Sequence, residues 1–320
     1  MPQFDAGRST LEVHRTAITG PGGRSPHAGH PELAQFKVLG PLEVVDGDRE
    51  CTPSAPKVRQ VLALLLLRAN KVVYTDSLIQ ELWGENPPPS ALTTIQTYIY
   101  HLRKLIERER LAADGQQMVA TRSPGYTLRI RDDQVDLARF ERLSRSGRDH
   151  LEHGRHAEAV TDLRAALAMW SGGPLANVNL GPCLSAYVAE LTEHQMTTLH
   201  LRIQAEMELG MHRELLGELR SLTATHPFDE WLHSQLILAL ERSGRRSDAL
   251  DVYHRLRTNL DRELGLDPSQ QIQKLHYQVL TATVPGSSAL DAGNGVITEG
   301  GGQWVGPGQD RVLALIDELG

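Results

Sequence analysis

The chain has 320 residues, of which 40% are hydrophobic and 23% are charged, and these proportions are typical of a globular protein with about two domains. Its two cysteines, Cys51 and Cys183, are too few and too far apart for a disulfide framework or a zinc site, which favours a reduced, cytoplasmic setting. The longest apolar run, Val61 to Leu67, is too short to cross a membrane, and no apolar signal segment opens the chain, so we expect neither secretion nor membrane association.

The net charge of −7 is unevenly distributed along the chain. Residues 33–131 contain 13 basic and 10 acidic residues, whereas residues 132–320 contain 17 basic and 27 acidic ones. Within the first of these ranges, residues 89–131 hold seven basic residues against three acidic ones. A local positive region attracts a polyanion even when the whole chain is acidic, so the composition does not exclude nucleic-acid binding.

The chain begins with a tail and a small predicted sheet. Residues 1–32 are rich in glycine and histidine without a sustained hydrophobic period, and we expect them to be disordered. Short β-type runs follow at 36–39 and 42–45, and the Asp46-Gly47 pair predicts a hairpin that brings residues 49–52 back as a third strand.

Three helices and a hairpin are predicted next. The first helix covers residues 57–69 after Pro56 and is apolar nearly all round, so it should be buried. The second covers residues 76–83, with Thr75 as its N-cap and Gly84 as its stop. Three prolines at 87–89 form a rigid connection to the third helix at 93–106. Residues 118–121 and 126–130 then predict a β-hairpin around 122–125.

The third helix has two unlike faces. At roughly 100° per residue, Ile95, Ile99, Leu102 and Ile106 fall on one apolar stripe. The opposite side carries hydrogen-bonding groups, aromatic rings and cations, with no carboxylate before Glu107. Base edges need hydrogen-bond partners and phosphates need cations, so this face suits the DNA major groove, although an ordinary solvated helix is the alternative. The candidates for base edges are Thr93, Gln96, Thr97, Tyr100 and His101, and those for phosphate are Arg103 and Lys104.

The order of elements describes a winged helix-turn-helix, in which the third helix enters the major groove and the hairpin lies along the DNA backbone. Arg122 in the hairpin turn would then lie near the minor groove. Lys57 and Arg59, at the start of the buried helix, are further candidates for phosphate contact, with plain solvated charge as the alternative.

Residues 132–281 predict helices throughout. Gly210 and Gly244 begin two similar turns 34 residues apart, which is the period of tetratricopeptide repeats, and Gly154 begins a third copy. Small residues such as Ala159 and Ala249 follow these turns and allow close helix packing. Stacked helix pairs of this kind present a concave surface to partners. Residues 282–309 are rich in Gly and Ser and predict a flexible linker, with a short amphipathic helix or a frayed end at 310–319.

Five segments in the first predicted domain match one family in the right order: residues 36–44, 56–66, 82–88, 98–106 and 123–128. They resemble the Streptomyces antibiotic regulatory protein family, whose DNA-binding half is similar to the output domain of OmpR-type response regulators. We expect no receiver domain with a phospho-acceptor before the match. The helical half resembles the bacterial transcriptional activation domain of the same family, notably at residues 260–269. The resemblance covers residues 33–281.

The resemblance implies a mainly α fold with a small β component. We therefore expect a disordered tail at 1–32, an OmpR-type winged-helix DNA-binding domain at 33–131, a tetratricopeptide-like activation domain at 132–281 and a flexible tail at 282–320. It further implies a pathway-specific transcriptional activator of antibiotic or other secondary-metabolite biosynthesis, cytoplasmic and associated with the nucleoid.

The same resemblance implies the partners. Two copies would bind side by side on direct repeats of double-stranded promoter DNA near the −35 region, and would recruit RNA polymerase holoenzyme through its sigma factor. In the family, the loop between the second and third helices faces the polymerase, although its prolines alone also describe a stiff turn. That loop contains Gly84, Glu85, Asn86, Pro87 and Pro88.

The sequence lacks the common catalytic motifs. It contains no Gly-x-Ser-x-Gly, His-Glu-x-x-His, Cys-x-x-Cys or dinucleotide fingerprint, and no Gly-Lys pair for a phosphate loop. His150, His153 and His156 are evenly spaced, but Gly154 interrupts their helix, so a metal cluster is not expected. We therefore predict no catalytic residue, metal or cofactor. Two alternatives stay open, a repeat-type scaffold for protein interaction and a repressor that uses the same DNA-binding fold.

Overall fold

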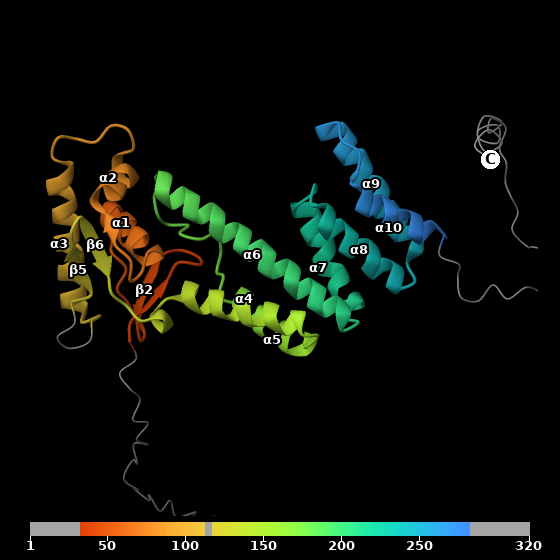
Figure 1. The fold of residues 1–320 in the computed structure, drawn as a ribbon, viewed down its shortest axis with the longest axis horizontal. Coiled ribbons are helices and arrows are strands. Elements are labelled where there is room, and N and C mark those ends of the chain that lie inside the picture. The colour runs from red at the N-terminus through yellow and green to blue at the C-terminus, as the bar shows by residue number, and fades with distance from the viewer. Residues whose placement is uncertain (1–32, 113–116, 282–320) are drawn as a thin grey trace, which may run out of the picture. The chain divides into compact units, whose positions relative to one another are not determined.

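The computed structural model describes residues 33–112 and 117–281, shown in Figure 1. These residues form two compact units: unit 1 contains residues 33–112, 117–143 and 165–195, and unit 2 contains residues 144–164 and 196–281. The tails expected at 1–32 and 282–320, with the short helix at 310–319, lie outside the described residues.

Unit 1 begins with a three-stranded antiparallel sheet in the order β1-β2-β3. Its strands are β1 (Gln35–Lys37), β2 (Glu43–Asp46) and β3 (Arg49–Glu50), and Phe36 pairs with Val44. Gly47 has a φ of 59°, the left-handed conformation that the hairpin turn requires and that glycine adopts without strain. The predicted sheet and its hairpin are confirmed.

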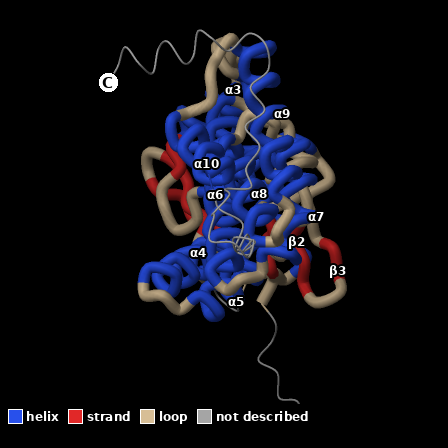
Figure 2. Tube along the Cα trace, turned by 90° about the vertical axis from the view of Figure 1, so that its right-hand side faces the viewer, coloured by secondary structure: helices blue, strands red, loops and turns tan. Residues whose placement is uncertain are grey.

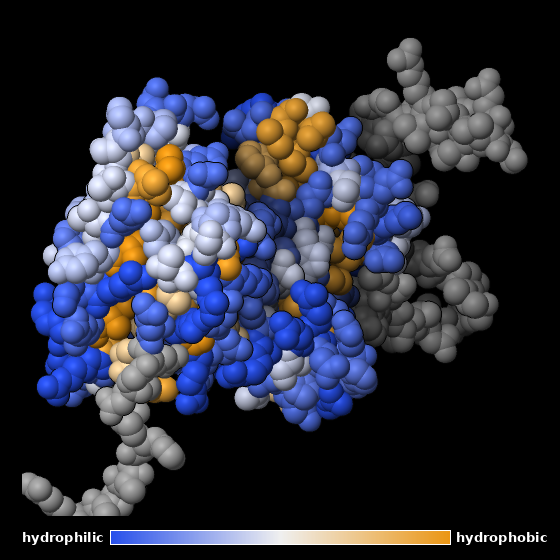
Figure 3. Space-filling model, turned by 60° about the vertical axis from the view of Figure 1, so that its left-hand side comes forward, coloured by the Kyte–Doolittle hydropathy of each residue, from blue (hydrophilic) through white to orange (hydrophobic). Residues whose placement is uncertain are grey.

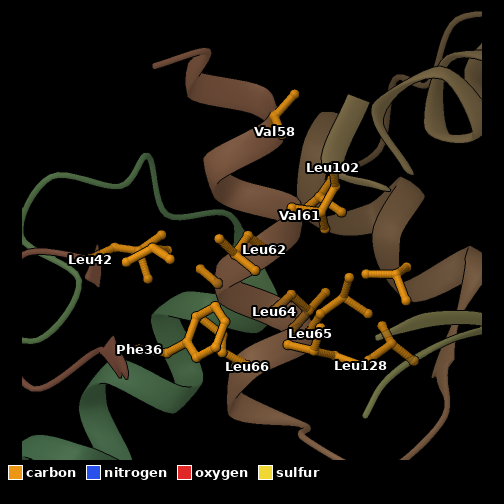
Figure 4. Close-up of a cluster of buried hydrophobic side chains, with 14 of the residues drawn as sticks. Phe36, Leu42, Val58, Val61, Leu62, Leu64, Leu65, Leu66, Leu102 and Leu128 are labelled. Atoms are coloured by element: carbon orange, nitrogen blue, oxygen red, sulfur yellow. The ribbon is translucent and has the colours of Figure 1, made fainter. Parts of the chain in front are cut away.

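Helix α1 (Pro56–Leu67) forms the centre of unit 1, as its all-round apolar sequence predicts. Pro56 is its first residue, where the missing N–H has no helical partner to lose. Figure 4 shows Phe36 of β1 and Leu42, which precedes β2, on one side of α1, and Leu102 and Leu128 on the other. The small sheet and the helix-hairpin half of unit 1 therefore share one core.

Helices α2 (Thr75–Trp83) and α3 (Ala91–Glu109) follow in the expected places. The prediction that Thr75 caps α2 is wrong. Thr75 is the first residue of the helix, the N-cap residue Tyr74 makes no side-chain cap, and the Thr75 hydroxyl donates to the carbonyl of Pro124 at 3.1 Å. This acceptor comes from the hairpin turn, which local sequence around Thr75 does not reveal.

A second antiparallel sheet contains β4 (Val73–Tyr74), β5 (Val119–Arg122) and β6 (Gly125–Leu128) in the order β4-β6-β5. The predicted hairpin is thus confirmed, and the short strand before α2 adds a third member to its sheet. A Cβ atom on Gly125 would lie 2.0 Å from the carbonyl oxygen of Val73. Glycine at this position therefore allows β4 to pair with the hairpin and hold it beside α2.

Unit 1 also includes residues beyond the winged-helix sequence: the 3-10 helix η1 (Asp132–Gln134), the start of α4 (Asp136–Glu152) and the start of α6 (Pro182–Glu208). The Asp136 carboxylate accepts hydrogen bonds from the backbone N–H groups of Val38, Leu39 and Leu137 at 2.8–3.0 Å. Burial raises the pKa of this carboxyl, and the three amide donors oppose that rise.

The loop before α6 is part of the same core. Leu175, Val178 and Leu184 are buried in one cluster with the apolar residues of α1. The side-chain amide of Asn177 pairs with both the N–H and the carbonyl of Leu42, at 2.7 and 3.1 Å. The expected domain boundary at residue 131 therefore differs from the edge of the compact unit, because buried side chains from 165–195 complete the core.

Unit 2 contains most of the helical region: most of α5 (His156–Leu167), and all of α7 (His212–Thr225), α8 (Glu230–Arg242), α9 (Arg246–Leu264) and α10 (Gln270–Thr281). Figure 2 shows α7, α8 and α9 as adjacent helices. Gly154, Gly210 and Gly244 have φ values of 72°, 77° and 74°, so the three turns share one backbone conformation. Ala159 and Ala249 are fully buried, which confirms the repeated turn-and-helix pattern.

A buried ion-pair network joins three helices within unit 2. Glu206 of α6 is 1% exposed and accepts from Arg202 at 2.9 Å and from Arg164 of α5 at 2.7 Å. Arg202 also pairs with Glu218 of α7 at 2.5 Å.

The fold is mainly helical with two small sheets, as predicted. In the described part of the chain, no helix combines the length and apolarity needed to cross a membrane.

Candidate nucleic-acid interface

One side of α3 is exposed along its whole length and lies at the left edge of unit 1 in Figure 1. Figure 3 brings that side forward and shows mainly hydrophilic side chains, with smaller hydrophobic areas between them. Between residues 93 and 104 the exposed residues recur every three or four positions, and we call them the α3 face: Thr93, Gln96, Thr97, Tyr100, His101 and Lys104.

The opposite side of α3 fixes the helix in the core. Ile95, Ile99 and Leu102 are at most 1% exposed and belong to the cluster around α1. At the N-terminal end, the carbonyl of Pro88 accepts from the N–H of Ala91 at 2.9 Å. The helix is therefore anchored on its apolar stripe and at its first turn, and the α3 face is presented on a rigid element.

The α3 face carries donors and acceptors that can address base edges. The Thr97 hydroxyl donates to the Thr93 carbonyl at 3.0 Å, which leaves its oxygen free to accept a second bond. Gln96 makes no side-chain hydrogen bond to another described residue, so both ends of its amide are available. The ring of Tyr100 is 5.9 Å from that of His101, centroid to centroid, and Tyr100 is 56% exposed. Together these groups match the mixed donor and acceptor pattern of the major groove.

The two predicted phosphate ligands on α3 differ in their surroundings. Lys104 is exposed, and its Nζ pairs with the exposed Glu107 at 2.8 Å, which raises the pKa of the lysine. Arg103 is half-buried; its Nε donates to the Val119 carbonyl at 3.0 Å and its Nη2 to the Thr121 hydroxyl at 2.8 Å. Lys104 is therefore available to a phosphate, whereas Arg103 holds the β-hairpin against α3.

The remaining predicted cations also divide into two kinds. Arg122 is exposed at the end of β5. Lys57, by contrast, donates from Nζ to the Leu82 carbonyl at 2.8 Å, and Arg59 donates to the carbonyls of Pro53 and Asn177 at 3.1 and 2.9 Å. These acceptors lie up to 118 residues away in sequence, so local spacing could not have shown that both side chains hold α1 in place.

The loop between α2 and α3 exposes Glu85, Asn86 and Pro87. Gly84 adopts a φ of 61° and its N–H bonds to the Gln80 carbonyl, which ends α2. Asn86 is held only by a long 3.4 Å bond from its N–H to the Trp83 carbonyl. The loop is thus defined in its backbone and open in its side chains.

Glu81, just before this loop, was missed by sequence reasoning. It is 3% exposed, and its carboxylate accepts from the N–H groups of Gly181 and Leu184 at 2.6 and 2.9 Å and from the Gln60 amide at 2.9 Å. A buried carboxylate at the first turn of α6 satisfies amides that have no helical partner. The one feature of the sequence that could have indicated this role is the position of Glu81 beside the apolar stripe of α2.

Over residues 33–112 and 117–281, no group of three or more His, Cys, Asp or Glu side chains is arranged to hold a metal ion. The Nδ1 of His150 accepts from the Nε of Arg155 at 2.8 Å, and His153 contacts the carbonyl of Asp149 at 2.7 Å. These histidines take part in local hydrogen bonding around the Gly154 turn.

Two family models match the chain. Residues 49–128 match the model described as transcriptional regulatory protein, C terminal, and residues 135–280 match the bacterial transcriptional activator domain. The regulatory protein DnrI of Streptomyces peucetius is 40% identical over 251 residues, which are 78% of this chain and 92% of DnrI. The regulatory protein AfsR of Streptomyces griseus is 34% identical over 82% of this chain, but this covers 27% of AfsR.

A solved structure is also similar. Mycobacterium tuberculosis EmbR, in complex with a low affinity phosphopeptide, superposes with a TM-score of 0.73 and 35% identity. The similarity covers 77% of this chain and 65% of the EmbR chain.

Proposed function

Because this chain belongs to the Streptomyces antibiotic regulatory protein family, with an OmpR-type winged helix and a bacterial transcriptional activator domain, we propose that it activates the promoters of a secondary-metabolite pathway. The family makes the chain a DNA-binding transcriptional regulator. The pathway-specific role, the arrangement of copies on DNA and the contact with polymerase are the proposal. It assigns DNA binding to residues 33–131 and activation to residues 132–281.

One observation supports DNA reading most strongly. The α3 face runs for three turns on a helix anchored in the core and contains hydrogen-bonding groups, aromatic rings and a lysine, but no carboxylate before Glu107. A solvated helix with no such role would be expected to mix acidic side chains into its exposed face, because they improve solubility at no cost to packing. A carboxylate-free face instead suits a surface that meets phosphates and base edges.

The proposed contacts follow from exposure and partners. Thr97, Tyr100 and His101 read base edges, since they occupy the middle of the open face. Lys104 binds phosphate, and Arg122 reaches the backbone or minor groove from the hairpin turn. Arg103 contributes indirectly, because it fixes the position of the hairpin relative to α3.

The arrangement on DNA comes from the family. Two copies bind side by side on direct repeats near the −35 region, and the loop containing Glu85 and Asn86 faces the sigma factor of RNA polymerase. The exposure of these two side chains, on a loop whose backbone is held by Gly84 and the following prolines, supports this assignment.

The first test is a gel shift of the full chain on fragments from neighbouring biosynthetic promoters, with footprinting of the bound fragments. We expect protection of two direct repeats that overlap or adjoin the −35 region. Absence of any sequence-specific shift would favour a protein-interaction scaffold instead.

In-vitro transcription with purified polymerase tests activation separately. The wild-type chain should increase transcription from the bound promoter, whereas a decrease would identify a repressor. A Glu85→Ala, Asn86→Ala chain should bind the promoter normally and activate poorly. If it activates as well as wild type, the loop does not contact the polymerase.

A further inference from the structure

A pocket opens on the second sheet, on the side of β6 that does not face the core. It is an open pocket with a volume of about 520 Å³, and it is lined by three arginines, a threonine and Asn70 among others. We call it the wing pocket and define it by Arg122, Thr127, Arg129, Arg131 and Asn70.

The direction of the side chains follows from the strand. Tyr126, Leu128 and Ile130 alternate along β6 and its extension and are buried in the core of unit 1. Successive side chains of a strand point to opposite faces, so Thr127 and Arg129 point to the other face, where the pocket lies. The cations are thus positioned by the same alternation that builds the core.

The pocket holds more positive than negative charge. Arg131 pairs with Asp133, its Nε donating to the carboxylate at 3.0 Å. For Arg122 and Arg129, no side-chain hydrogen bond or ion pair is formed with any other residue of 33–112 or 117–281. Three guanidinium groups therefore border one pocket, and among the described residues Asp133, the partner of Arg131, is the one carboxylate paired with any of them.

Thr127 gives an independent sign that a ligand belongs there. Its residue is 7% exposed, and its Oγ1 atom is enclosed without a hydrogen-bond partner among the described residues. Buried hydroxyls are normally hydrogen-bonded, because desolvation without a partner is unfavourable. Asn70, which also lines the pocket, is paired elsewhere, with both the N–H and the carbonyl of Ile130 at 3.2 and 2.8 Å.

We propose that the wing pocket binds one phosphate-type oxyanion. Guanidinium groups present paired N–H donors that match the oxygens of phosphate, and the Thr127 hydroxyl supplies a further donor at the buried end of the pocket. The phosphate belongs either to the DNA backbone, a source that rests on the proposed function, or to a free phosphate compound.

The first arm of the test uses inorganic phosphate and the full chain without DNA. Thermal unfolding is measured against phosphate concentration, with chloride holding the ionic strength constant. The unfolding midpoint should rise saturably for wild type and for the control Arg139→Gln, which changes an exposed arginine of unit 1 outside the pocket. Apparent phosphate affinity should fall about tenfold in Arg129→Gln and about fivefold in the near-isosteric Thr127→Val.

The second arm measures binding of the same variants to duplex DNA at several salt concentrations. Weaker binding by Arg129→Gln and Thr127→Val, with a salt slope reduced by about one unit, identifies a backbone phosphate. Binding equal to that of Arg139→Gln, together with lost response to inorganic phosphate, identifies a free phosphate compound.

Two results separate this proposal from the proposed function. If neither arm distinguishes the pocket variants from Arg139→Gln, the wing pocket binds no phosphate. If wild type responds to inorganic phosphate through Arg129 and Thr127 but binds no DNA, the pocket stands and the DNA-binding role fails.

Discussion

Replacing Glu81 should disrupt unit 1 at the point where the winged helix meets the start of α6. Glu81→Ala removes a buried carboxylate that accepts from two backbone N–H groups and from the side chain of Gln60. A hydrogen bond to a charged group contributes about 1.5–3 kcal/mol, and the contributions of such neighbours do not add fully. We therefore expect the free energy of unfolding of unit 1 to fall by about 3–5 kcal/mol, because donors buried beside an apolar core lose their acceptor together.

Glu81→Gln should lose about half as much, since one oxygen remains as an acceptor while the new NH₂ group meets a backbone N–H. Glu190→Ala is the matched control, because Glu190 is an exposed glutamate of α6, the helix whose first turn Glu81 of α2 contacts.

Native-state hydrogen exchange gives the sharpest assay, because two compact units need not unfold in one transition. The amide hydrogen of Leu184 should exchange faster in Glu81→Ala, whereas its exchange rate should be unchanged in Glu190→Ala. Urea unfolding should give the total decrease in the free energy of unfolding. Equal stability and equal exchange in the two alanine variants would refute the assignment of Glu81 as the acceptor that joins α2 to α6.

Three further predictions concern single charged groups. Lys104→Ala should weaken binding to all duplex DNA and lower the slope of log K against log salt by about one unit. The control Lys274→Ala, which changes an exposed lysine of α10, should leave both the affinity and the slope unchanged. The same slope in both variants would mean that Lys104 does not contact DNA. Glu206→Ala should cost unit 2 about 3–5 kcal/mol in urea unfolding, because it removes the buried carboxylate that pairs with both Arg164 and Arg202 and leaves Arg202 with Glu218 alone. A loss under about 1 kcal/mol would mean that water replaces these pairs. Burial lowers the pKa of His233 in the folded chain, so the histidine binds a proton more readily in the unfolded chain. The stability of unit 2 should therefore fall as the pH drops below the ordinary histidine pKa of about 6.5. His233→Gln should reduce this pH dependence when unfolding is measured above and below that pH.

Local patterns were sufficient to predict much of the fold. The all-round apolar run of α1 and the two faces of α3 both depend on residues a few positions apart, and the structure places both helices where the sequence predicts them. The Asp46-Gly47 turn and the three glycine turns of the helical half are also local, because a left-handed backbone is needed at one known residue.

Long-range partners account for what could not be predicted. Lys57 and Arg59 are of the residue types that bind DNA phosphates, so their identity alone does not indicate a structural role. That role, fixing α1, follows from their acceptors, the carbonyls of Leu82 and Asn177. Arg103 belongs to the predicted DNA-reading helix, but Val119 and Thr121 hold its guanidinium against the hairpin.

The extent of unit 1 shows the same limit. The boundary expected at residue 131 follows a change in sequence pattern from winged helix to helical repeats. The core does not follow that change, because Leu175 and Leu184 are buried with α1 and Asp136 caps the edge of the first sheet. Such pairing across about a hundred residues is decided by tertiary packing.

The most direct test of the central claim is selection of bound sequences from a random duplex pool by the full chain and by Tyr100→Ala, His101→Ala and Tyr277→Ala. Tyr277 is an exposed tyrosine of α10 and controls for loss of an aromatic side chain away from α3. If α3 reads the major groove, the Tyr100 and His101 variants should select altered or relaxed sequences at defined positions, while Tyr277→Ala selects the wild-type sequence. Selection of the wild-type sequence by all four proteins would contradict the claim that the α3 face recognises DNA.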